Sequence, residues 1–375
     1  GINAVGGFYI YDLTKPTKQE VLDTEKFIFP SDLQSNTQAG DFQSGLTIHG
    51  NIVAIGSAFY DNQFGQSAGA VWLYDLSSND IQGSEIKVET STFRMGVSVD
   101  IYKKKMIVST PFDSTIDGNA GAAFLYDISS FNKSDIENSE IKILPSDGGG
   151  GFRFGKSASI HGNKIAIGAN EDSNSNGIRA GAVYLYDISS FNKTDIQASE
   201  IKVIANDSGF DGEDRFGSSV KISDSHLIVG AIRGGTLPGG GDKGQVYFYD
   251  ISKFNKPEIE ASEMPLLASD GEQGDRFGFD IDYKGISFLV GSPRHNDRAG
   301  AAYLYDMAVD SQDIENSEQK LLAFDSQGST LTDSVGDEFG ASVAMGLSKI
   351  SISSPEDNNT NGDDAGAVYI FNKEQ

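Results

Sequence analysis

Two loops in this sequence carry oxygen-bearing side chains at alternate positions, a spacing that suits a hard cation. Each has three Asp or Asn residues followed by glycine: Asp172, Asn174, Asn176 and Gly177 in the first, and Asp357, Asn359, Asn361 and Gly362 in the second. Calcium needs several converging oxygen atoms, and an EF-hand loop begins with the same pattern. The bidentate acid that completes an EF-hand is absent, and the same residue types form ordinary turns. Both loops are therefore candidate Ca2+ sites, with simple turns as the competing interpretation.

A third loop combines basic, acidic and imidazole groups in Arg294, His295, Asp297 and Arg298. Arginine binds anionic sugars, and a His near an Asp can act as acid and base. An exposed polar loop without a ligand would have the same composition. The sequence has no recognisable Ser/His/Asp or Cys/His nucleophile arrangement. We therefore predict a ligand-binding loop, no catalytic residues and no enzymatic activity.

A seven-residue phrase returns seven times and shows which elements must position these loops. It reads GGFYIYD at residues 6–12 and recurs in related form at residues 69–75, 121–127, 181–187, 244–250, 300–306 and 366–372. The spacing of 52 to 66 residues is too long for repeated helix pairs and suits one four-stranded sheet in each repeat. We predict an all-β fold, a β-propeller of four-stranded antiparallel blades, as a single domain over residues 1–375.

The repeat at residues 152–203 illustrates the expected blade. Its four strands are predicted at residues 154–160, 164–169, 181–187 and 200–204. The first two form a tight hairpin, and the second is small and apolar throughout, as expected where neighbouring blades cover both of its faces. The candidate loops therefore join second strands to third strands. All loops of this kind should gather on one face of the propeller.

The repeats do not close evenly, because the first two strands recur six times and the third strand recurs seven times. In circular order the missing piece is a fourth strand, then a first and a second. We predict seven blades, one of them incomplete, with the missing strands lost, cleaved off or supplied by a partner. The alternative is six blades, closed by residues 26–29 pairing beside residues 366–371 with the strand at residues 6–12 outside them.

The strings RFGSSV at residues 215–220, IVGA at residues 228–231 and RFG at residues 276–278 resemble FG-GAP repeats. The resemblance covers essentially the whole chain. It implies the seven-bladed propeller of integrin α-subunits and of many surface proteins, and with it an extracellular or cell-surface location and a role in adhesion. The integrin-type repeat holds calcium in the hairpin between the first two strands. The hairpins here, such as residues 161–163, lack the necessary carboxylates, so the chain looks like the bacterial variant.

The composition argues against two classes of partner. A formal net charge of −25 repels nucleic acid and anionic lipid surfaces. No segment approaches the run of about 20 apolar residues that spans a bilayer. Cysteine is absent, so neither disulfides nor thiolate metal sites stabilise the fold. We expect neither nucleic-acid binding nor membrane insertion.

Three functions remain. The first is a non-catalytic extracellular or cell-surface interaction module that binds a protein or a glycan through loops on one propeller face. The second is a structural subunit of a surface filament or layer, because an incomplete blade exposes strand edges that invite self-assembly or strand complementation. The third is a polysaccharide-active enzyme, for which Arg294 and His295 are the only candidate site.

Overall fold

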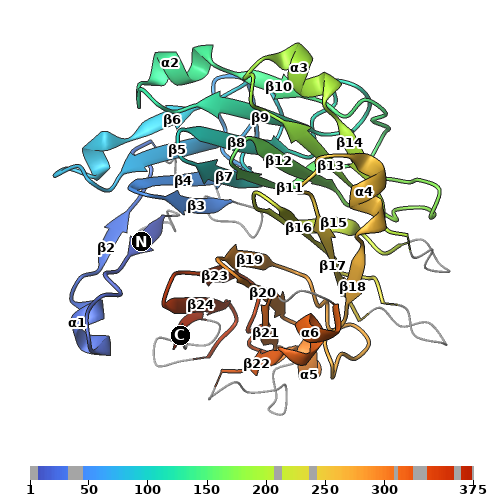
Figure 1. Cartoon of the computed structure of the whole chain (residues 1–375). Helices are drawn as coiled ribbons and strands as arrows, with labels where there is room; N and C mark the ends of the chain where they lie inside the picture. The colour runs from blue at the N-terminus through green and yellow to red at the C-terminus, as the bar shows by residue number, and fades with distance from the viewer. Residues whose placement is uncertain are drawn as a thin grey trace. The chain divides into compact units, whose positions relative to one another are not determined.

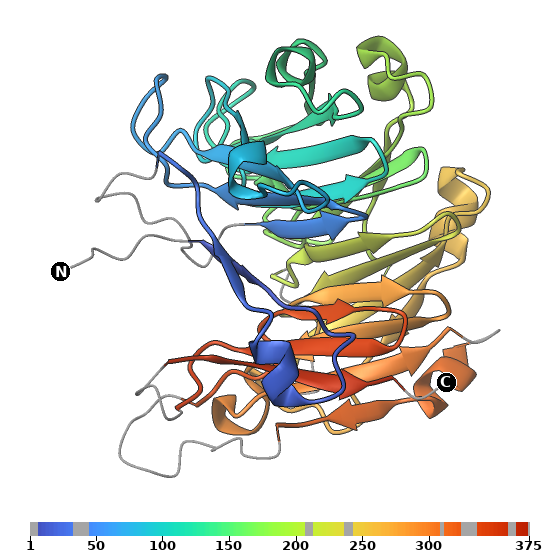
Figure 2. The same cartoon turned by 90° about the vertical axis from the view of Figure 1, so that its left-hand side faces the viewer.

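Strands form where the repeated phrases place β-branched and aromatic residues in alternation, and the loops between them are rich in Gly, Asn, Asp and Ser. The computed structural model describes residues 7–32, 45–206, 213–235, 243–307, 311–323, 336–358 and 365–373. Two compact units are present, residues 1–144 and residues 145–375, and each is considered by itself. Figures 1 and 2 show the elements of both units in two views.

The first unit holds one hairpin and two four-stranded blades. The hairpin is β1 (Phe8–Ile10), α1 (Lys18–Leu22) and β2 (Lys26–Ile28). The first blade is β3 (Leu46–His49), β4 (Ile52–Ser57), β5 (Ala70–Asp75), η1 (Gln82–Ser84) and β6 (Ile86–Val88). The second is β7 (Val99–Tyr102), β8 (Lys105–Thr110), β9 (Ala122–Asp127), α2 (Lys133–Asn138) and β10 (Ile141–Ile143).

The second unit holds three four-stranded blades and one three-stranded blade. The first is β11 (Phe154–His161), β12 (Lys164–Ala169), β13 (Ala182–Asp187), α3 (Lys193–Ala198) and β14 (Ile201–Val203). The second is β15 (Phe216–Ile222), β16 (His226–Ala231), β17 (Gln245–Asp250), α4 (Lys256–Ala261) and β18 (Met264–Leu266). The third is β19 (Ile281–Lys284), β20 (Ser287–Ser292), α5 (His295–Arg298), β21 (Ala301–Asp306), α6 (Ser311–Asn316) and β22 (Gln319–Leu321). The last is β23 (Val343–Met345), β24 (Lys349–Ser354) and β25 (Ala367–Asn372).

The fold is an all-β propeller of antiparallel blades, as predicted, but the prediction of seven blades is wrong. Six blades are present, five of four strands and one of three. The six-bladed alternative has the correct number but the wrong pairing for residues 26–29. These residues form β2, which pairs with β1 through Phe8 opposite Ile28 and Tyr9 opposite Phe27.

The hairpin β1–β2 has the geometry of a third and a fourth strand. Its pairing of Phe8 with Ile28 repeats the pairing of Val183 with Val203 in a complete blade. The Tyr11 hydroxyl donates to Glu25 at 2.6 Å, just as Tyr186 of β13 donates to Glu200, the residue before the fourth strand β14, at 2.7 Å. The count of seven third strands was therefore correct, but the seventh belongs to half a blade in the part of the chain that the structure describes.

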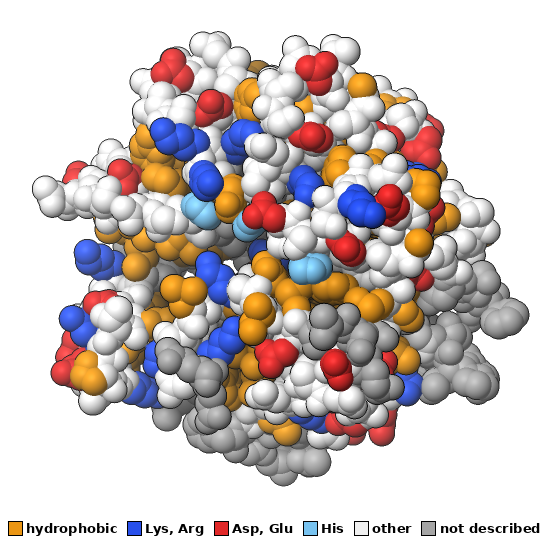
Figure 3. All heavy atoms as spheres, viewed as in Figure 1, with side chains coloured by type: hydrophobic (Ala, Val, Ile, Leu, Met, Phe, Trp, Pro, Cys, Tyr) orange, Lys and Arg blue, Asp and Glu red, His pale blue; other side chains and the backbone are white. Residues whose placement is uncertain are grey.

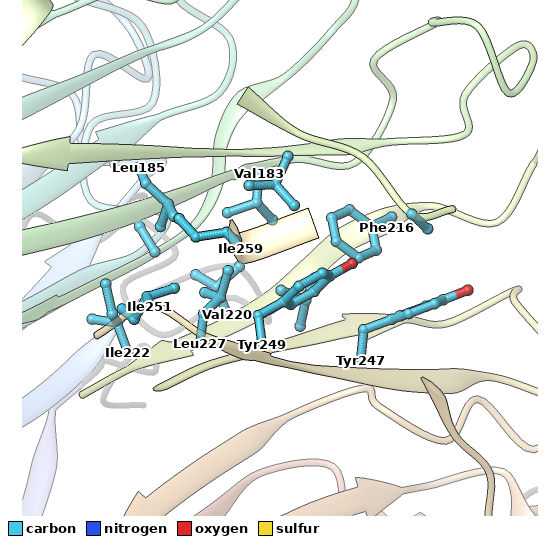
Figure 4. Packing of buried hydrophobic residues seen from close by; sticks show 14 of the residues in the cluster. Val183, Leu185, Phe216, Val220, Ile222, Leu227, Tyr247, Tyr249, Ile251 and Ile259 are labelled. Atoms are coloured by element: carbon cyan, nitrogen blue, oxygen red, sulfur yellow. The ribbon is translucent and has the colours of Figure 1, made fainter. Parts of the chain in front are cut away.

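Neighbouring blades pack through apolar side chains that alternate along the third strand. In Figure 4, Val183 and Leu185 of β13 point toward Phe216 and Val220 of the next blade. These side chains are buried. The pairing of sheet faces in this way removes apolar area from water, which is the main stabilising term for such a fold.

A recurring latch joins the outer rims of successive blades. The third residue after a fourth strand donates its backbone N–H, and in three of four cases its hydroxyl, to the glutamate that precedes the fourth strand of the next blade. The pairs are Ser31 with Glu85, Ser146 with Glu200, Asn206 with Glu263 and Ser269 with Glu318. Each of these glutamates also accepts a hydrogen bond from a third-strand tyrosine, such as Tyr186 at 2.7 Å.

Glycine near the end of four of the six second strands permits backbones of adjacent blades to touch, while β8 and β24 carry Ser109 and Ser353 at that position. A Cβ on Gly168, Gly230 or Gly291 would overlap the carbonyl oxygen of Gly217, Gly278 or Gly340, respectively. The same overlap would occur between Gly56 and Gly96 in the first unit. At these four contacts an added Cβ would lie 2.1 Å from the facing carbonyl oxygen, so glycine is required there for packing.

We expect Gly230→Ala to lower the free energy of unfolding by about 3 kcal/mol, because the added methyl group collides with fixed backbone of the next blade. Gly118→Ala is the control, since a Cβ there meets no atom within 4 Å. Urea denaturation of both variants measures the difference. An unchanged midpoint for Gly230→Ala would contradict this account of blade spacing.

Candidate functional site

The candidate loops lie at one end of the blades, named here the loop end, where second strands finish and third strands begin. The last residue of β12, Ala169, pairs with the first residue of β11 on one side and of β13 on the other. Isolated bridges join neighbouring blades at this end, such as Gly181 with Phe216 and Gly244 with Phe277. Within each unit, the loops of successive blades therefore lie next to one another.

Three of the predicted site residues occupy a single repeat position. Asp172, His295 and Asp357 are each the third residue after a second strand, and Tyr60, Asp113 and Gly234 hold that position in the other blades. The repeats therefore place very different side chains in equivalent surroundings. The chemistry of this position depends on its neighbours in each blade.

Asp172 lies fully buried in a network of charged and hydroxyl groups. Its Oδ2 accepts hydrogen bonds from the Tyr184 hydroxyl at 2.9 Å and from the Lys202 ammonium at 2.8 Å. The same two donors also reach Asp147, each at 2.7 Å. Burial acts to raise the pKa of Asp147, but the hydrogen bonds from Lys202 and Tyr184 outweigh it and hold that pKa below its usual range. The network is therefore a buried ion pair that fixes the loop.

The other residues of this predicted calcium loop are also engaged. The Asn174 amide donates to Asp172 at 3.1 Å and to the Gly181 carbonyl at 2.8 Å. The side-chain Oδ1 of Asn174 accepts a hydrogen bond from the backbone N–H of Asn176 at 2.9 Å. Calcium at this loop would have to displace Lys202 from Asp172. The calcium hypothesis stays a prediction, and a calcium-dependent rise in melting temperature would support it.

The second predicted calcium loop is described only in part. Asp357 is buried, and its Oδ2 accepts the Tyr369 hydroxyl at 2.6 Å. Asn359 and Asn361 lie outside the described residues. Across the ranges that the structure describes, no group of three or more His, Asp or Glu side chains is placed to hold a metal ion.

His295 replaces the buried aspartate in its own blade. It is 7% exposed, its Nδ1 lies 2.8 Å from Asp275, and its Nε2 lies 2.7 Å from the Lys320 ammonium. Lysine can only donate, so Nε2 must accept and the ring proton must sit on Nδ1, where it donates to Asp275. Lys320 and Tyr303 also bind Asp270, at 2.6 and 2.8 Å. Both ring nitrogens are thus occupied by structural partners.

The other residues of the predicted ligand-binding loop separate into different surroundings. Asp297 is exposed and has a left-handed backbone with φ of 55°. Arg298 donates to Glu338 at 2.6 Å and to Glu356 at 3.1 Å. Arg294 forms no ion pair with the described part of the chain, and its buried Nε has no hydrogen-bond partner there. Of the predicted set, Arg294 is the cation that stays uncompensated.

The arginines form the group that the sequence prediction missed. The chain has eight, and all lie at the loop end: Arg94, Arg153, Arg179, Arg215, Arg233, Arg276, Arg294 and Arg298. Four of them occupy one position, just before the Phe-Gly or Met-Gly that begins a first strand, and have left-handed φ of 57° to 60°. The lysine-rich segments at the opposite end of the blades contain no arginine. Alignment of the repeats would therefore have shown that arginine is confined to the loop end.

Comparison with models of known protein families shows which family the chain belongs to. The FG-GAP repeat matches residues 138–186, 198–249, 261–305 and 316–371, which is more than half of the sequence. The chain belongs to the FG-GAP repeat family. Each matched segment ends within the third strand of a blade of the second unit. No curated protein matches the sequence.

Two solved structures are similar to this FG-GAP propeller. The β-propeller domain of the Trilobed protease from Pyrococcus furiosus, described as having an open velcro topology, has a TM-score of 0.50 at 13% identity, over 88% of this chain and 81% of that chain. The acylaminoacyl peptidase of Pyrococcus horikoshii has a TM-score of 0.47 at 12% identity, over 88% of this chain and 44% of that chain. At these identities the first similarity supports the propeller fold alone.

We expect Lys202→Met to lower the free energy of unfolding of this FG-GAP propeller by about 3 kcal/mol at neutral pH, because it leaves the buried Asp172 carboxylate without its cation. The depressed pKa of Asp147 contributes stability above about pH 4 that is lost as the pH falls through its folded-state pKa. The gap between variant and wild type should therefore shrink below about pH 4, as urea unfolding at several pH values would show.

Lys253→Met is the matched control, because its ion pair with Glu258 at 2.9 Å is largely exposed. This variant should unfold like the wild type across the same pH range, since exposed pairs contribute little. Equal destabilisation by the two substitutions would mean that burial of Asp172 does not govern the effect.

Proposed function

We propose that this FG-GAP propeller is a non-catalytic interaction module that binds a protein or glycan ligand at its loop end, outside the cell or at the cell surface. The observation that carries the proposal is that seven of the eight arginines lie at the loop end of the blades of the second unit, in a chain with a net charge of −25. Arginine is enriched at binding surfaces because its planar fork pairs with oxyanions and stacks on rings. The location rests on the FG-GAP resemblance.

A binding role accounts for the predicted site better than hydrolysis or elimination of a polysaccharide does. His295 would be the acid or base of such an enzyme, but both of its ring nitrogens hold structural partners. An acid or base must reach the proton that it transfers. Arg294, by contrast, is only partly buried and forms no ion pair within the described ranges.

The chain has no cysteine, so single cysteines can test which end binds the ligand. Ile178 in a loop at the loop end is 71% exposed, and Ile286 in a hairpin turn at the opposite end is 72% exposed. Ile178→Cys and Ile286→Cys would each be coupled to a bulky polyethylene-glycol maleimide. Binding to an array of defined glycans and purified surface proteins should be lost for the first conjugate and kept for the second. Equal binding by both conjugates would contradict a loop-end site.

A second candidate function, self-assembly by strand complementation, is favoured by the half-blade. Tyr9 is 56% exposed on β1, whereas Tyr184 at the same repeat position is fully buried. The ring centroids of Tyr9 and Phe27 lie 4.7 Å apart, and those of Phe27 and Phe29 lie 5.8 Å apart. These rings form an uncovered aromatic face. Figure 3 shows further hydrophobic side chains at the surface of the face that it displays.

The last blade has a similar uncovered face. Val368 and Ile370 of β25 are 65% and 45% exposed, while Val183 and Leu185 at the equivalent positions are buried. Among the described strands, β25 pairs only with β24, and β1 pairs only with β2. Two different open edges on one chain suit head-to-tail contact between copies, with the hairpin of one copy on the β25 edge of the next.

We expect the wild-type chain to associate as its concentration rises and Tyr9→Ser with Phe27→Ser to stay monomeric, as sedimentation velocity would show. Leu347→Ser is the control, because Leu347 is 85% exposed but lies in the turn between β23 and β24. A wild-type chain that stays monomeric at every concentration tested would contradict assembly through these edges.

A further inference from the structure

A cavity of about 410 Å³ opens at the loop end of the second blade of the first unit. It lies between the segment that precedes β7 and the loop that joins β8 to β9, and its lining includes Ser91, Phe93, Phe112, Ser114 and Asn119. Small-molecule sites in proteins occupy about 300–1,000 Å³, so the cavity is large enough for a ligand.

The Arg94 guanidinium fixes the aromatic part of this cavity. It lies 4.5 Å from the ring centroids of Phe59 and Phe112 and 5.2 Å from that of Phe93. The rings of Phe93 and Phe112 meet edge to face, with their centroids 6.5 Å apart. Phe93 is nevertheless 42% exposed. A ring that is held in this way loses little conformational entropy when a ligand stacks on it.

Hydroxyl and amide groups that a ligand can reach accompany the ring. Within the described ranges, the Ser91 hydroxyl and the Asn119 side chain form no hydrogen bond. The Ser114 hydroxyl accepts the backbone N–H of Asn119 at 3.1 Å and can still donate its own proton. All three side chains are exposed. The cavity therefore offers both donors and acceptors.

Asp113 is the one charged residue among the described residues that line the cavity, and it is already paired. It is buried, and its Oδ2 accepts hydrogen bonds from the Lys142 ammonium and the Thr92 hydroxyl, each at 2.8 Å. Lys142 also donates to the Thr115 hydroxyl at 2.6 Å. The carboxylate and the ammonium neutralise each other, so the cavity has no charge to offer an ionic ligand.

Comparison of the repeats shows that Phe93, Phe112 and Asn119 stand where blades of the second unit carry charged residues. The charged equivalents are Asp275 for Phe93, Glu171 for Phe112 and Arg179 for Asn119. In this blade a ring replaces each carboxylate and an amide replaces the guanidinium. The exchange favours a ligand without charge.

A sugar ring has the chemistry that matches these groups. One side of a pyranose exposes C–H bonds, whose partial positive charge is attracted to the negative face of an aromatic ring. Its hydroxyls need donors and acceptors around that stacked position. An acidic sugar would gain no ion pair, because the Lys142 ammonium is held by Asp113.

We propose that this cavity binds one uncharged pyranose unit, which stacks on the Phe93 ring and forms hydrogen bonds with Ser91, Ser114 and Asn119. The presence of such a unit in the ligand of the loop end rests on the proposed function. The affinity for a free sugar does not, because a monosaccharide can occupy the cavity alone.

The first experiment titrates the full chain with free monosaccharides and detects binding by saturation-transfer NMR. The neutral probes are glucose, galactose, mannose and N-acetylglucosamine, and glucuronate is the charged reference. At least one neutral sugar should bind, and more tightly than glucuronate. Failure of all four to bind, or binding of glucuronate as tight as that of the best of them, would overturn the proposal.

Substitutions of Phe93 then locate the binding. Phe93→Leu keeps an apolar side chain but removes the ring, and it should weaken the binding of the best neutral sugar at least about tenfold. Phe93→Tyr keeps the ring and should bind like the wild type, which separates loss of stacking from loss of structure. Unchanged affinity in Phe93→Leu, or an equal loss in Phe93→Tyr, would contradict stacking on this residue.

Phe64→Leu is the matched control. Phe64 is 52% exposed in the loop between β4 and β5 and does not line this cavity. Its substitution should leave sugar binding unchanged. Loss of affinity in this variant equal to that in Phe93→Leu would mean that the sugar meets exposed rings in general, and the assignment to the cavity would fail.

A second experiment separates the cavity from the function of the loop end. Wild type and Phe93→Leu would be compared on the glycan array. Array binding that Phe93→Leu keeps but the Ile178→Cys conjugate loses would overturn the cavity site and leave the loop-end function intact. Monosaccharide binding that depends on Phe93, with array binding that both cysteine conjugates keep, would support the cavity and contradict the loop-end function.

Discussion

Contact between glycine backbones of adjacent blades is the constraint on which the other features depend. At Gly230 and its equivalents the second strand touches the first strand of the next blade without an intervening side chain. This close approach brings the loop ends of consecutive blades together within each unit. It lets third-strand residues such as Val183 and Leu185 reach the core of the next blade. It also places the residue before one blade's first strand against the loop of the preceding blade. Arg94 shows this contact, because its guanidinium lies 4.5 Å from the ring of Phe59.

A rigid and regular spacing of this kind allows one repeat position to hold different chemistry in each blade. The third residue after the second strand is a buried aspartate in three blades and a histidine in another, and a fourth-strand lysine pairs with Asp172 as it does with His295. The second residue after the second strand carries an aromatic ring, a carboxylate or a guanidinium, depending on the blade. Because the backbone stays the same, a different residue at such a position alters the local charge without altering the blade. This is why several blades can carry arginine at the loop end.

The sequence was sufficient for the fold because strand alternation and repeated phrases are local signals. The third strand at residues 181–187 and its six relatives could be placed, and the family resemblance was correct. The number of blades could not be counted from third strands, because the strand at residues 6–12 looks the same whether or not a first and second strand complete it. In the structure it forms β1 of a half-blade.

The candidate site was harder to predict because the state of each side chain depends on partners that are distant in the sequence. The pattern of Asp172, Asn174 and Asn176 is compatible with a cation, but Lys202, which lies 30 residues away, already occupies the carboxylate. His295 looked reactive in isolation and is held by Asp275 and Lys320. Arg294 was selected with it, but the positions that Arg215, Arg233 and Arg276 occupy at the loop end become clear only when the repeats are compared. No short motif contains all four.

The rim latches have a consequence for how this molecule gains and loses its structure. The hydroxyl latches join residues 54, 54 and 49 positions apart, so each ties a blade only to its successor. Cooperativity in such an array is of the nearest-neighbour kind, and order spreads from whichever blade forms first. Opening would likewise travel from one blade to the next. Protease-resistant fragments should then end between blades, near the segments that follow fourth strands.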